Sequence, residues 1–168
     1  MFKGDVVFMN PAPAMPVLRK LLVVDDNPII QWTVYFALRD KGFLVLMAGT
    51  IADGLNLIHQ QKPELVLLDL NFPSDSADFG GASWDGFAAM EWLRHTGDCD
   101  NIPIIVISET DPEVSRPRAL AAGAAAYLPK PFERHQLLAS VFAALGKSTA
   151  KAPDQTLHPQ NSRSLKMA

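Results

Sequence analysis

The chain has 168 residues, enough for one domain with a hydrophobic core and terminal extensions, and 48% of the residues are hydrophobic and 20% charged. The formal net charge of -3 provides no general attraction to nucleic acid or to an anionic membrane, so we expect neither as a partner. A single cysteine excludes an internal disulfide, and no apolar stretch approaches the ~20 residues of a transmembrane helix. Because the N-terminus also lacks a signal-peptide pattern, we expect a cytoplasmic protein.

The first part of the chain predicts an extension, a strand and a helix. Residues 1–18 contain three prolines, which oppose a helix, and are predicted to form an N-terminal extension. Residues 21–24 are a short apolar run that predicts a strand. A helix is predicted next, because Asn27 is a typical N-cap and Pro28 suits the first helical position. Gly42 is predicted to end this helix.

The next elements complete an alternating pattern. Residues 43–47 predict a second strand, and Thr50 is a suitable cap for a second helix. Residues 65–71, LVLLDLN, place four consecutive apolar residues before Asp69, which is typical of a strand that is buried on both faces of a parallel sheet and has Asp69 at its carboxyl edge. The order strand, helix, strand, helix, strand implies a parallel sheet with right-handed crossovers.

The second half continues the alternation after an irregular stretch. Residues 74–84, rich in Ser, Gly and Asp, are predicted to be an insertion before the third helix. Residues 104–108, IIVIS, predict the fourth strand. Pro117 costs ~3 kcal/mol inside a helix, so the fourth helix is predicted to begin late or to be kinked there. Residues 124–128 predict a short fifth strand.

The last predicted helix is amphipathic. Its apolar residues recur at the spacing i, i+3, i+4 and i+7: Leu138, Val141, Phe142 and Leu145. Gly146 is predicted to end it. Residues 148–168 are polar and aperiodic, so we expect a disordered C-terminal tail.

Polar side chains stand at the ends of four predicted strands: Asp25 and Asp26, Asp69, Ser108 and Lys130. In a parallel sheet these ends share one edge, where ligands bind in open α/β folds. Three carboxylates in one crevice repel, and Mg²⁺ together with the Lys130 ammonium would compensate their charge. Because Mg²⁺ commonly binds phosphate oxygens, the pattern indicates phosphoryl chemistry with Asp69 as nucleophile.

Each of these residues also has an ordinary structural explanation. Aspartates after a strand often cap helices, a serine can form a turn, and a lysine before a proline can be a solvated charge. Their joint placement at one edge is what favours a functional site.

Four motifs, VVDDNP, LVLLDLNFP, PIIVIS and YLPKPF, occur in an order and spacing that resemble the response regulator receiver domain of two-component signalling. The resemblance covers about residues 19–147. It implies an α/β, flavodoxin-like, doubly wound five-stranded parallel sheet with strand order 2-1-3-4-5. It also implies a stand-alone receiver, because the segment after the fifth helix is too short and polar for an output domain.

The resemblance implies roles for the acidic residues. Asp69 accepts a phosphoryl group from a histidine of a sensor kinase or a histidine phosphotransfer protein. The Mg²⁺ ion is held by Asp26, Asp69 and the backbone carbonyl of Asn71, while Asp25 acts through a metal-bound water. The output partner is unknown, and a homodimer is an open alternative to a monomer.

Further roles follow for residues near the other strand ends. Ser108 and Lys130 bind the phosphoryl group, and the lysine is usually followed by a cis peptide bond. Tyr127 matches the aromatic residue that turns inward on phosphorylation, although it can also simply cover the end of the core. Glu109, where the family prefers a small residue, and Thr110 are candidate modulators.

Two other functions stay open at this point. A receiver-like binding module that is not phosphorylated is one: Glu109 makes it possible, but the complete acid set and Lys130 argue against it. A phosphatase of the haloacid dehalogenase type is the other, but it needs a second aspartate as general acid where this chain has Asn71. The loop that contains the insertion at 74–84 is about nine residues longer than the family norm. The insertion is either a solvated loop or a lid or docking element.

Overall fold

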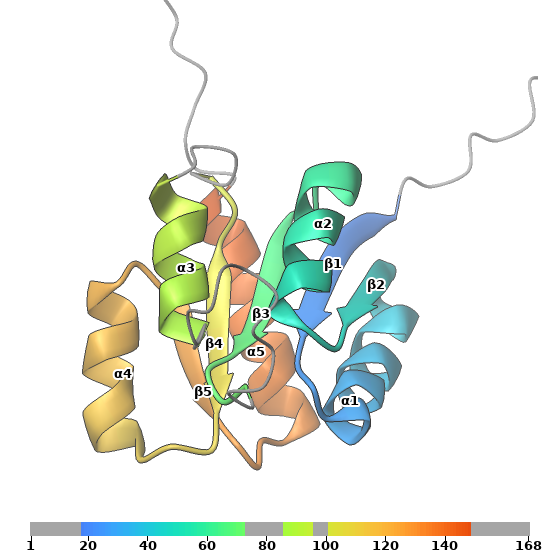
Figure 1. The fold of residues 1–168 in the computed structure, drawn as a ribbon. Helices are drawn as coiled ribbons and strands as arrows, with labels where there is room; N and C mark the ends of the chain where they lie inside the picture. The colour runs from blue at the N-terminus through green and yellow to red at the C-terminus, as the bar shows by residue number, and fades with distance from the viewer. Residues whose placement is uncertain (1–17, 73–85, 96–100, 149–168) are drawn as a thin grey trace, which may run out of the picture.

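A computed structural model describes residues 18–72, 86–95 and 101–148, which form three layers with a sheet between two layers of helices (Figure 1). The sheet has five strands in the order β2-β1-β3-β4-β5, and every neighbouring pair is parallel. The strands are β1 Arg19–Val24, β2 Phe43–Ala48, β3 Leu65–Asp69, β4 Ile104–Ser108 and β5 Ala126–Pro129. The helices are α1 Pro28–Leu38, α2 Ile51–Gln61, α3 Gly86–His95, α4 Pro112–Ala121 and α5 Arg134–Ser148, with a short 3-10 turn, η1, at Arg39–Lys41.

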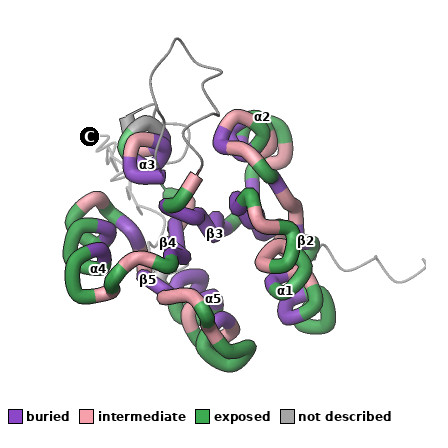
Figure 2. Tube along the Cα trace, turned by 60° about the horizontal axis from the view of Figure 1, so that its bottom comes forward, coloured by how far each residue is buried: buried purple, intermediate pink, exposed green. Residues whose placement is uncertain are grey.

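The sheet is buried on both faces because its strands are almost wholly apolar. Alternate residues of a strand point to opposite faces. In β3, Leu65 and Leu67 pack in the core under α1 and α5, whereas Val66 and Leu68 pack in the core under α2, α3 and α4. In Figure 2 the buried strands run between these two layers. The predicted doubly wound fold and its strand order are thereby confirmed.

The predicted N-caps of the first two helices are also confirmed, whereas α1 ends at Leu38 and not at Gly42 as predicted. The Asn27 side chain accepts a hydrogen bond from the Ile29 amide at 2.9 Å, which caps α1. Thr50 accepts one from the Asp53 amide at 3.1 Å, which caps α2. Gly42, with φ of 81°, ends the 3-10 turn in a left-handed conformation that glycine adopts without strain.

The third strand ends at Asp69, so this residue lies at the carboxyl edge of the strand as predicted. The start of the fifth strand differs from the sequence prediction. The fifth strand begins at Ala126 instead of Ala124, because Gly123, with φ of 94°, turns the chain immediately after α4.

Of the two alternatives predicted for α4, a late start or a kink at Pro117, the late start is wrong. The helix begins at Pro112, capped by Asp111, and Pro117 lies inside it. Pro117 and Glu113, the residue four positions earlier, are both exposed. Water can therefore bind the Glu113 carbonyl that lacks a helical donor, which reduces the penalty for the proline.

The predicted apolar face of α5 was partly wrong. The buried stripe consists of Leu137, Val141, Ala144 and Leu145. Phe142 is 50% exposed, and its ring lies 5.9 Å from that of Phe43. Gly146 does not end the helix, which continues through Ser148. The periodicity identified the helix correctly, but packing against the sheet selected a face rotated toward Leu137.

Several predictions concern segments outside the described residues. These are the N-terminal extension, the insertion at 74–84 and the tail beyond Ser148. No helix among the described residues is both long and apolar enough to span a membrane.

Substitution by alanine at two different glycines should change the free energy of unfolding in opposite directions. A Cβ at Gly86 would overlap the Asp69 carbonyl oxygen and the Leu70 Cα, whereas a Cβ at Gly146 would meet no atom within 4 Å. We expect Gly86→Ala to lower the free energy of unfolding by about 1–3 kcal/mol, as overpacking does. Gly146→Ala, the matched control, should raise it by up to ~1 kcal/mol because alanine favours helix. Urea unfolding of both variants measures this difference, and equal effects would contradict the close approach at Gly86.

Candidate functional site

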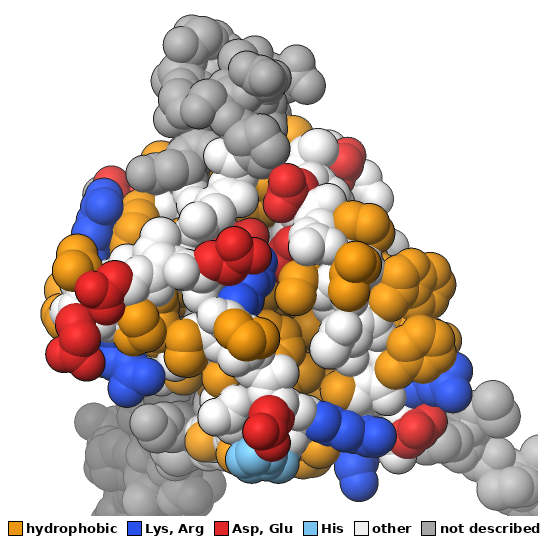
Figure 3. Space-filling view, turned by 90° about the horizontal axis from the view of Figure 1, so that it is seen from below, with side chains coloured by type: hydrophobic (Ala, Val, Ile, Leu, Met, Phe, Trp, Pro, Cys, Tyr) orange, Lys and Arg blue, Asp and Glu red, His pale blue; other side chains and the backbone are white. Residues whose placement is uncertain are grey.

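Polar residues from separate strand ends meet at one edge of the sheet. Val24 is in register with Leu68, and Ser108 with Pro129, so β1, β3, β4 and β5 end at a similar level. The residues at or just after these ends are Asp25, Asp26, Asp69, Ser108 and Lys130. Figure 3 views the molecule from this edge and shows acidic and basic side chains meeting near the middle of the face. The structure thus brings together the side chains that the sequence predicted.

Lys130 lies between two buried carboxylates. Its Nζ atom is 2.7 Å from Asp25 Oδ2 and 2.7 Å from Asp69 Oδ2. The Asp25 residue is fully buried, and Asp69 is 2% exposed. One ammonium group therefore bridges the ends of β1 and β3 from the end of β5.

Backbone amides hold the second oxygen of each carboxylate. Asp25 Oδ1 accepts a hydrogen bond from the Asn27 amide at 2.9 Å. Asp69 Oδ1 accepts one from the Asn71 amide at 3.0 Å. Both contacts span two residues and form turns just after their strands. Each carboxylate is consequently fixed by its own turn on one side and by Lys130 on the other.

Burial and pairing shift the pKa values of Asp69 and Lys130. Burial raises the pKa of the Asp69 carboxyl, and the hydrogen bonds from Lys130 and from the Asn71 amide offset only part of this rise. Burial disfavours the Lys130 ammonium, but its contacts with Asp25 and Asp69 more than compensate and raise its pKa. Stabilisation that comes from the raised Lys130 pKa is fully present at neutral pH and is lost as the pH rises through that pKa.

The three aspartates form a cluster suited to a cation. Asp25, Asp26 and Asp69 each offer a carboxylate oxygen, and these oxygens lie within 4.8 Å of one another. When ionised, the cluster carries three negative charges against the one positive charge of Lys130. Asp26, unlike the other two, is exposed and open to a ligand. Excess negative charge and oxygen ligands fit a hard divalent cation.

Ser108 links this cluster to a second group of polar side chains. Its hydroxyl is fully buried and donates a hydrogen bond to the Asn71 side-chain oxygen at 3.0 Å. It also lies 2.8 Å from the Thr110 hydroxyl. Thr110 in turn donates to the Ser115 hydroxyl on α4 at 2.7 Å. The Asn71 side chain and Ser115 are contacts that the sequence prediction missed.

Tyr127 and Glu109 occupy different environments. The Tyr127 side chain is buried in the core, and its hydroxyl donates to the Thr110 carbonyl oxygen at 3.0 Å. Glu109 is exposed. Two arginines of α4 lie over aromatic rings, Arg116 over Tyr127 and Arg118 over Phe87. The roles of Tyr127 as a switch and of Glu109 as a modulator stay predictions.

Gln31 is another residue that the sequence did not mark. Its side-chain amide donates to the carbonyl oxygens of Asp25 at 2.6 Å and of Ala48 at 3.1 Å. It thereby ties the first turns of α1 to the ends of β1 and β2. Nothing in the local sequence distinguishes this glutamine from any other on a helix, since both acceptors belong to other elements.

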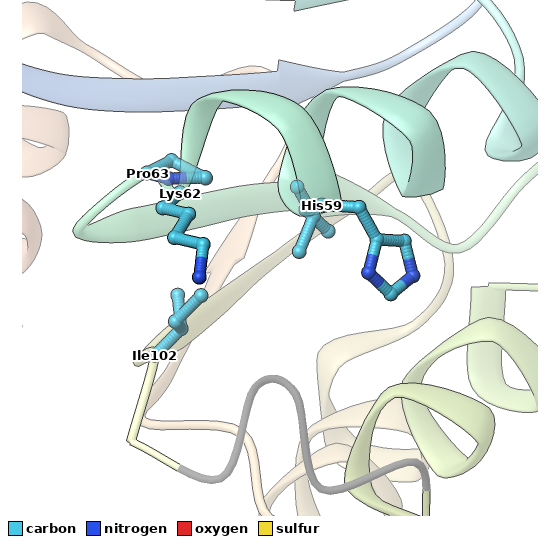
Figure 4. Close-up of a pocket in the computed structure, with 5 residues that line it drawn as sticks. His59, Lys62, Pro63 and Ile102 are labelled. Atoms are coloured by element: carbon cyan, nitrogen blue, oxygen red, sulfur yellow. The ribbon is translucent and has the colours of Figure 1, made fainter.

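A separate hollow lies at the opposite edge of the sheet (Figure 4). It measures about 260 Å³ and is lined by Ile58, His59, Lys62, Pro63 and Ile102. The Lys62 side chain extends toward Ile102, whereas the His59 ring turns away from it. The described lining contains no carboxylate, so the acidic cluster is not part of this hollow.

The response regulator receiver domain family matches residues 21–142. The chain therefore belongs to this family. With its strand order and edge cluster, the molecule is a CheY-like receiver domain of two-component signalling.

Two curated relatives differ in how much of their length the chain covers. Response regulator MprA of Mycolicibacterium vanbaalenii is 36% identical over 135 residues, which are 80% of this chain and 53% of MprA. Protein PilH of Pseudomonas aeruginosa is 30% identical over 128 residues, which are 76% of this chain and 98% of PilH. The chain thus spans about half the length of MprA and nearly all of PilH.

Solved structures agree with the fold. A CheY-like receiver domain protein from Methanospirillum hungatei has a TM-score of 0.68 and 26% identity, and the match covers 81% of this chain and 100% of that one. The chemotaxis protein CheY4 of Vibrio cholerae has a TM-score of 0.65 and 26% identity, with coverage of 76% and 99%. Both likenesses support the flavodoxin-like architecture seen here.

The ion pairs of Lys130 predict a change in how Asp69 titrates. Lys130→Met removes the ammonium that opposes the effect of burial, so the pKa of Asp69, already raised, should rise further. Carbon-13 NMR of the aspartate carboxyl carbons, without added metal, measures the titration. Lys41→Met, on the exposed 3-10 turn, is the control and should leave Asp69 unchanged. An Asp69 pKa that is unchanged in Lys130→Met would contradict the bridging role of the lysine.

Proposed function

We propose that this chain is a phosphoacceptor receiver, in which Asp69 takes a phosphoryl group from a partner phosphohistidine. The observation that carries the proposal is the buried Asp69 carboxylate, bridged by Lys130 to Asp25 and close to the exposed Asp26. A buried nucleophile beside a fixed cation suits attack on an anionic group. Phosphorylation would change the surface of the domain, and an output partner would recognise this change.

The residues of this chain have distinct parts in the proposed transfer. An Asp69 oxygen bonds to phosphorus while the phosphorus-nitrogen bond of the donor breaks and leaves the imidazole with its electron pair. Lys130 and the Ser108 hydroxyl lie near Asp69 and bind the phosphoryl oxygens. Water then attacks the phosphorus, the bond to the Asp69 oxygen breaks and inorganic phosphate leaves, which regenerates the carboxylate. The catalysis is therefore limited to the domain's own phosphorylation and dephosphorylation.

We propose Mg²⁺ as the cofactor of this reaction. Asp26, Asp69 and the backbone carbonyl of Asn71 would hold the ion, and Asp25 would act through a bound water. When bound, Mg²⁺ neutralises negative charge on the phosphoryl oxygens. The charge excess of the aspartate cluster supports a divalent ion, and the phosphate chemistry favours magnesium over calcium.

A protein donor is supported by the surface beside the site. The first turns of α1 follow Asp26 directly and expose large apolar side chains: Ile29 by 72%, Trp32 by 51% and Phe36 by 50%. Figure 3 shows hydrophobic side chains gathered on the side of this face where α1 lies. Exposed apolar patches of this kind commonly contact other proteins. A sensor histidine kinase or a histidine phosphotransfer protein is the donor class we infer.

The extent and setting of the domain belong to the same proposal. We infer a receiver unit over residues 19–147, with the N-terminal extension, the insertion at 74–84 and the tail outside its core. A receiver that takes its phosphoryl group from a kinase acts in the cytoplasm. Neither nucleic acid nor a membrane is required for the reaction.

An unphosphorylated binding module is the alternative that Glu109 makes possible. Its exposed carboxylate would repel an incoming phosphoryl group if it faced the site. The buried pairing of Asp69 with Lys130 supports the phosphoacceptor instead, because two buried carboxylates are costly to retain without a use. The phosphatase alternative is not supported, since Asn71 uses its amide and side-chain oxygen as hydrogen-bonding groups and has no carboxyl proton to give.

Phosphoryl uptake tests the proposal. After incubation with acetyl phosphate and Mg²⁺, the wild-type chain should gain the mass of one phosphoryl group. Asp69→Asn should gain none, because an amide is not a nucleophile. Asp40→Asn removes an exposed carboxylate that is not part of the aspartate cluster, so this variant should behave as wild type. Intact-mass spectrometry measures all three, and equal uptake by Asp69→Asn, or no uptake by the wild type, would overturn the proposal.

A further inference from the structure

We propose that Ser115, on α4, is a positioning residue that acts through Thr110 to orient the Ser108 hydroxyl toward a phosphoryl group on Asp69. The inference rests on the proposed phosphoacceptor function and adds a residue that lies outside the acidic cluster.

Three hydroxyl groups form a continuous chain from the site to α4. Ser108 Oγ lies 2.8 Å from Thr110 Oγ1, and Thr110 Oγ1 lies 2.7 Å from Ser115 Oγ. Ser108 is fully buried and Ser115 is 9% exposed. Water therefore has little access to the two ends of the chain, and the hydroxyls depend on one another for hydrogen bonds.

Without a phosphoryl group, the number of hydroxyl protons determines which hydroxyl donates to which. Each hydroxyl has a single proton to donate. The Thr110 hydroxyl gives its proton to Ser115, so this hydroxyl cannot also donate to Ser108, whose oxygen accepts from the Thr110 backbone amide at 3.2 Å. The Ser108 proton is then shared between two neutral acceptors, the Asn71 side-chain oxygen at 3.0 Å and Thr110 Oγ1 at 2.8 Å. The donors in this state run from Ser108 toward α4.

A phosphoryl group on Asp69 would reverse this direction. Its anionic oxygens are stronger acceptors than an amide or hydroxyl oxygen, so they would take the Ser108 proton. Thr110 would then turn to donate to Ser108 Oγ, and Ser115 would donate to Thr110. All three protons would point toward the anion, and hydrogen bonds aligned in this way strengthen one another.

Ser115 is the donor available to Thr110 in the reversed chain. The other hydroxyl close to Thr110 Oγ1 is that of Tyr127, at 3.4 Å. Tyr127 already gives its proton to the Thr110 carbonyl oxygen at 3.0 Å. Without Ser115, the Thr110 hydroxyl would lose its donor, and the hold of Ser108 on the phosphoryl group would weaken.

Beryllium fluoride, which adds to a carboxylate as a mimic of the phosphoryl group, provides an equilibrium test. Isothermal titration in the presence of Mg²⁺ gives the apparent Kd for the full-length chain. We expect Ser115→Ala and Thr110→Val each to weaken binding by about two- to threefold, because each removes the cooperative strengthening that the aligned hydroxyls gain when the anion is bound. Thr110→Ser keeps the hydroxyl and should bind as wild type does. Ser115→Cys, with a weak donor and similar volume, should be intermediate, and it tests the chain if the alanine variant is unstable.

A double variant separates positioning from a general loss of structure. Thr110→Val already interrupts the row of hydrogen-bonded hydroxyl groups. Adding Ser115→Ala should therefore weaken the binding of beryllium fluoride no further. Effects that multiply in the double variant, or Ser115→Ala binding as tightly as wild type, would overturn the inference. If the wild type itself neither binds beryllium fluoride nor takes up phosphoryl groups, the phosphoacceptor proposal fails instead, so the two failures are distinguishable.

Discussion

The contact on which the rest of this site depends is the Lys130 ammonium between the Asp25 and Asp69 carboxylates. Taking charges out of water costs several kcal/mol for each ion, and pairing with good hydrogen bonds is what makes the burial tolerable. That pairing needs the ends of β1, β3 and β5 at one edge of the sheet, which the parallel order β2-β1-β3-β4-β5 provides. Asn27 and Asn71 complete the arrangement, since their backbone amides fix the second oxygen of each carboxylate.

The same arrangement leaves the edge with too much negative charge. Lys130 compensates one carboxylate of three, while Asp26 remains exposed. A divalent cation would stabilise an edge of this kind most. After the proposed phosphoryl transfer, any hydrogen-bond donor that reaches the new anion would stabilise it further. The Ser108 hydroxyl is such a donor, and its contacts with Asn71 and Thr110 show that other acceptors compete for its single proton. The proposed chemistry at Asp69 would therefore be linked to hydrogen bonding near α4 through one hydroxyl group.

Much of this architecture could be predicted from sequence because its causes are local. Continuous apolar runs identified the strands, and Asn27 and Thr50 identified helix starts through side-chain capping. The face of α5 and the start of α4 could not be predicted in this way, because packing against the sheet and solvent access at Pro117 decided them. Residues such as Gln31 and Ser115 were missed for the same reason. Their partners belong to other elements or lie several residues away, so no local pattern marks them.

The most direct test of this account is a calorimetric titration of Mg²⁺ into the wild-type chain and two alanine variants. The account predicts binding by the wild type and a loss of about tenfold or more in affinity for Asp26→Ala, because this exposed carboxylate would contact the ion directly. Asp25→Ala should lose less, since Asp25 is paired with Lys130 and would reach the ion through water. Equal losses in the two variants, or no binding by the wild type, would contradict the claim that a divalent cation completes the charge of this edge.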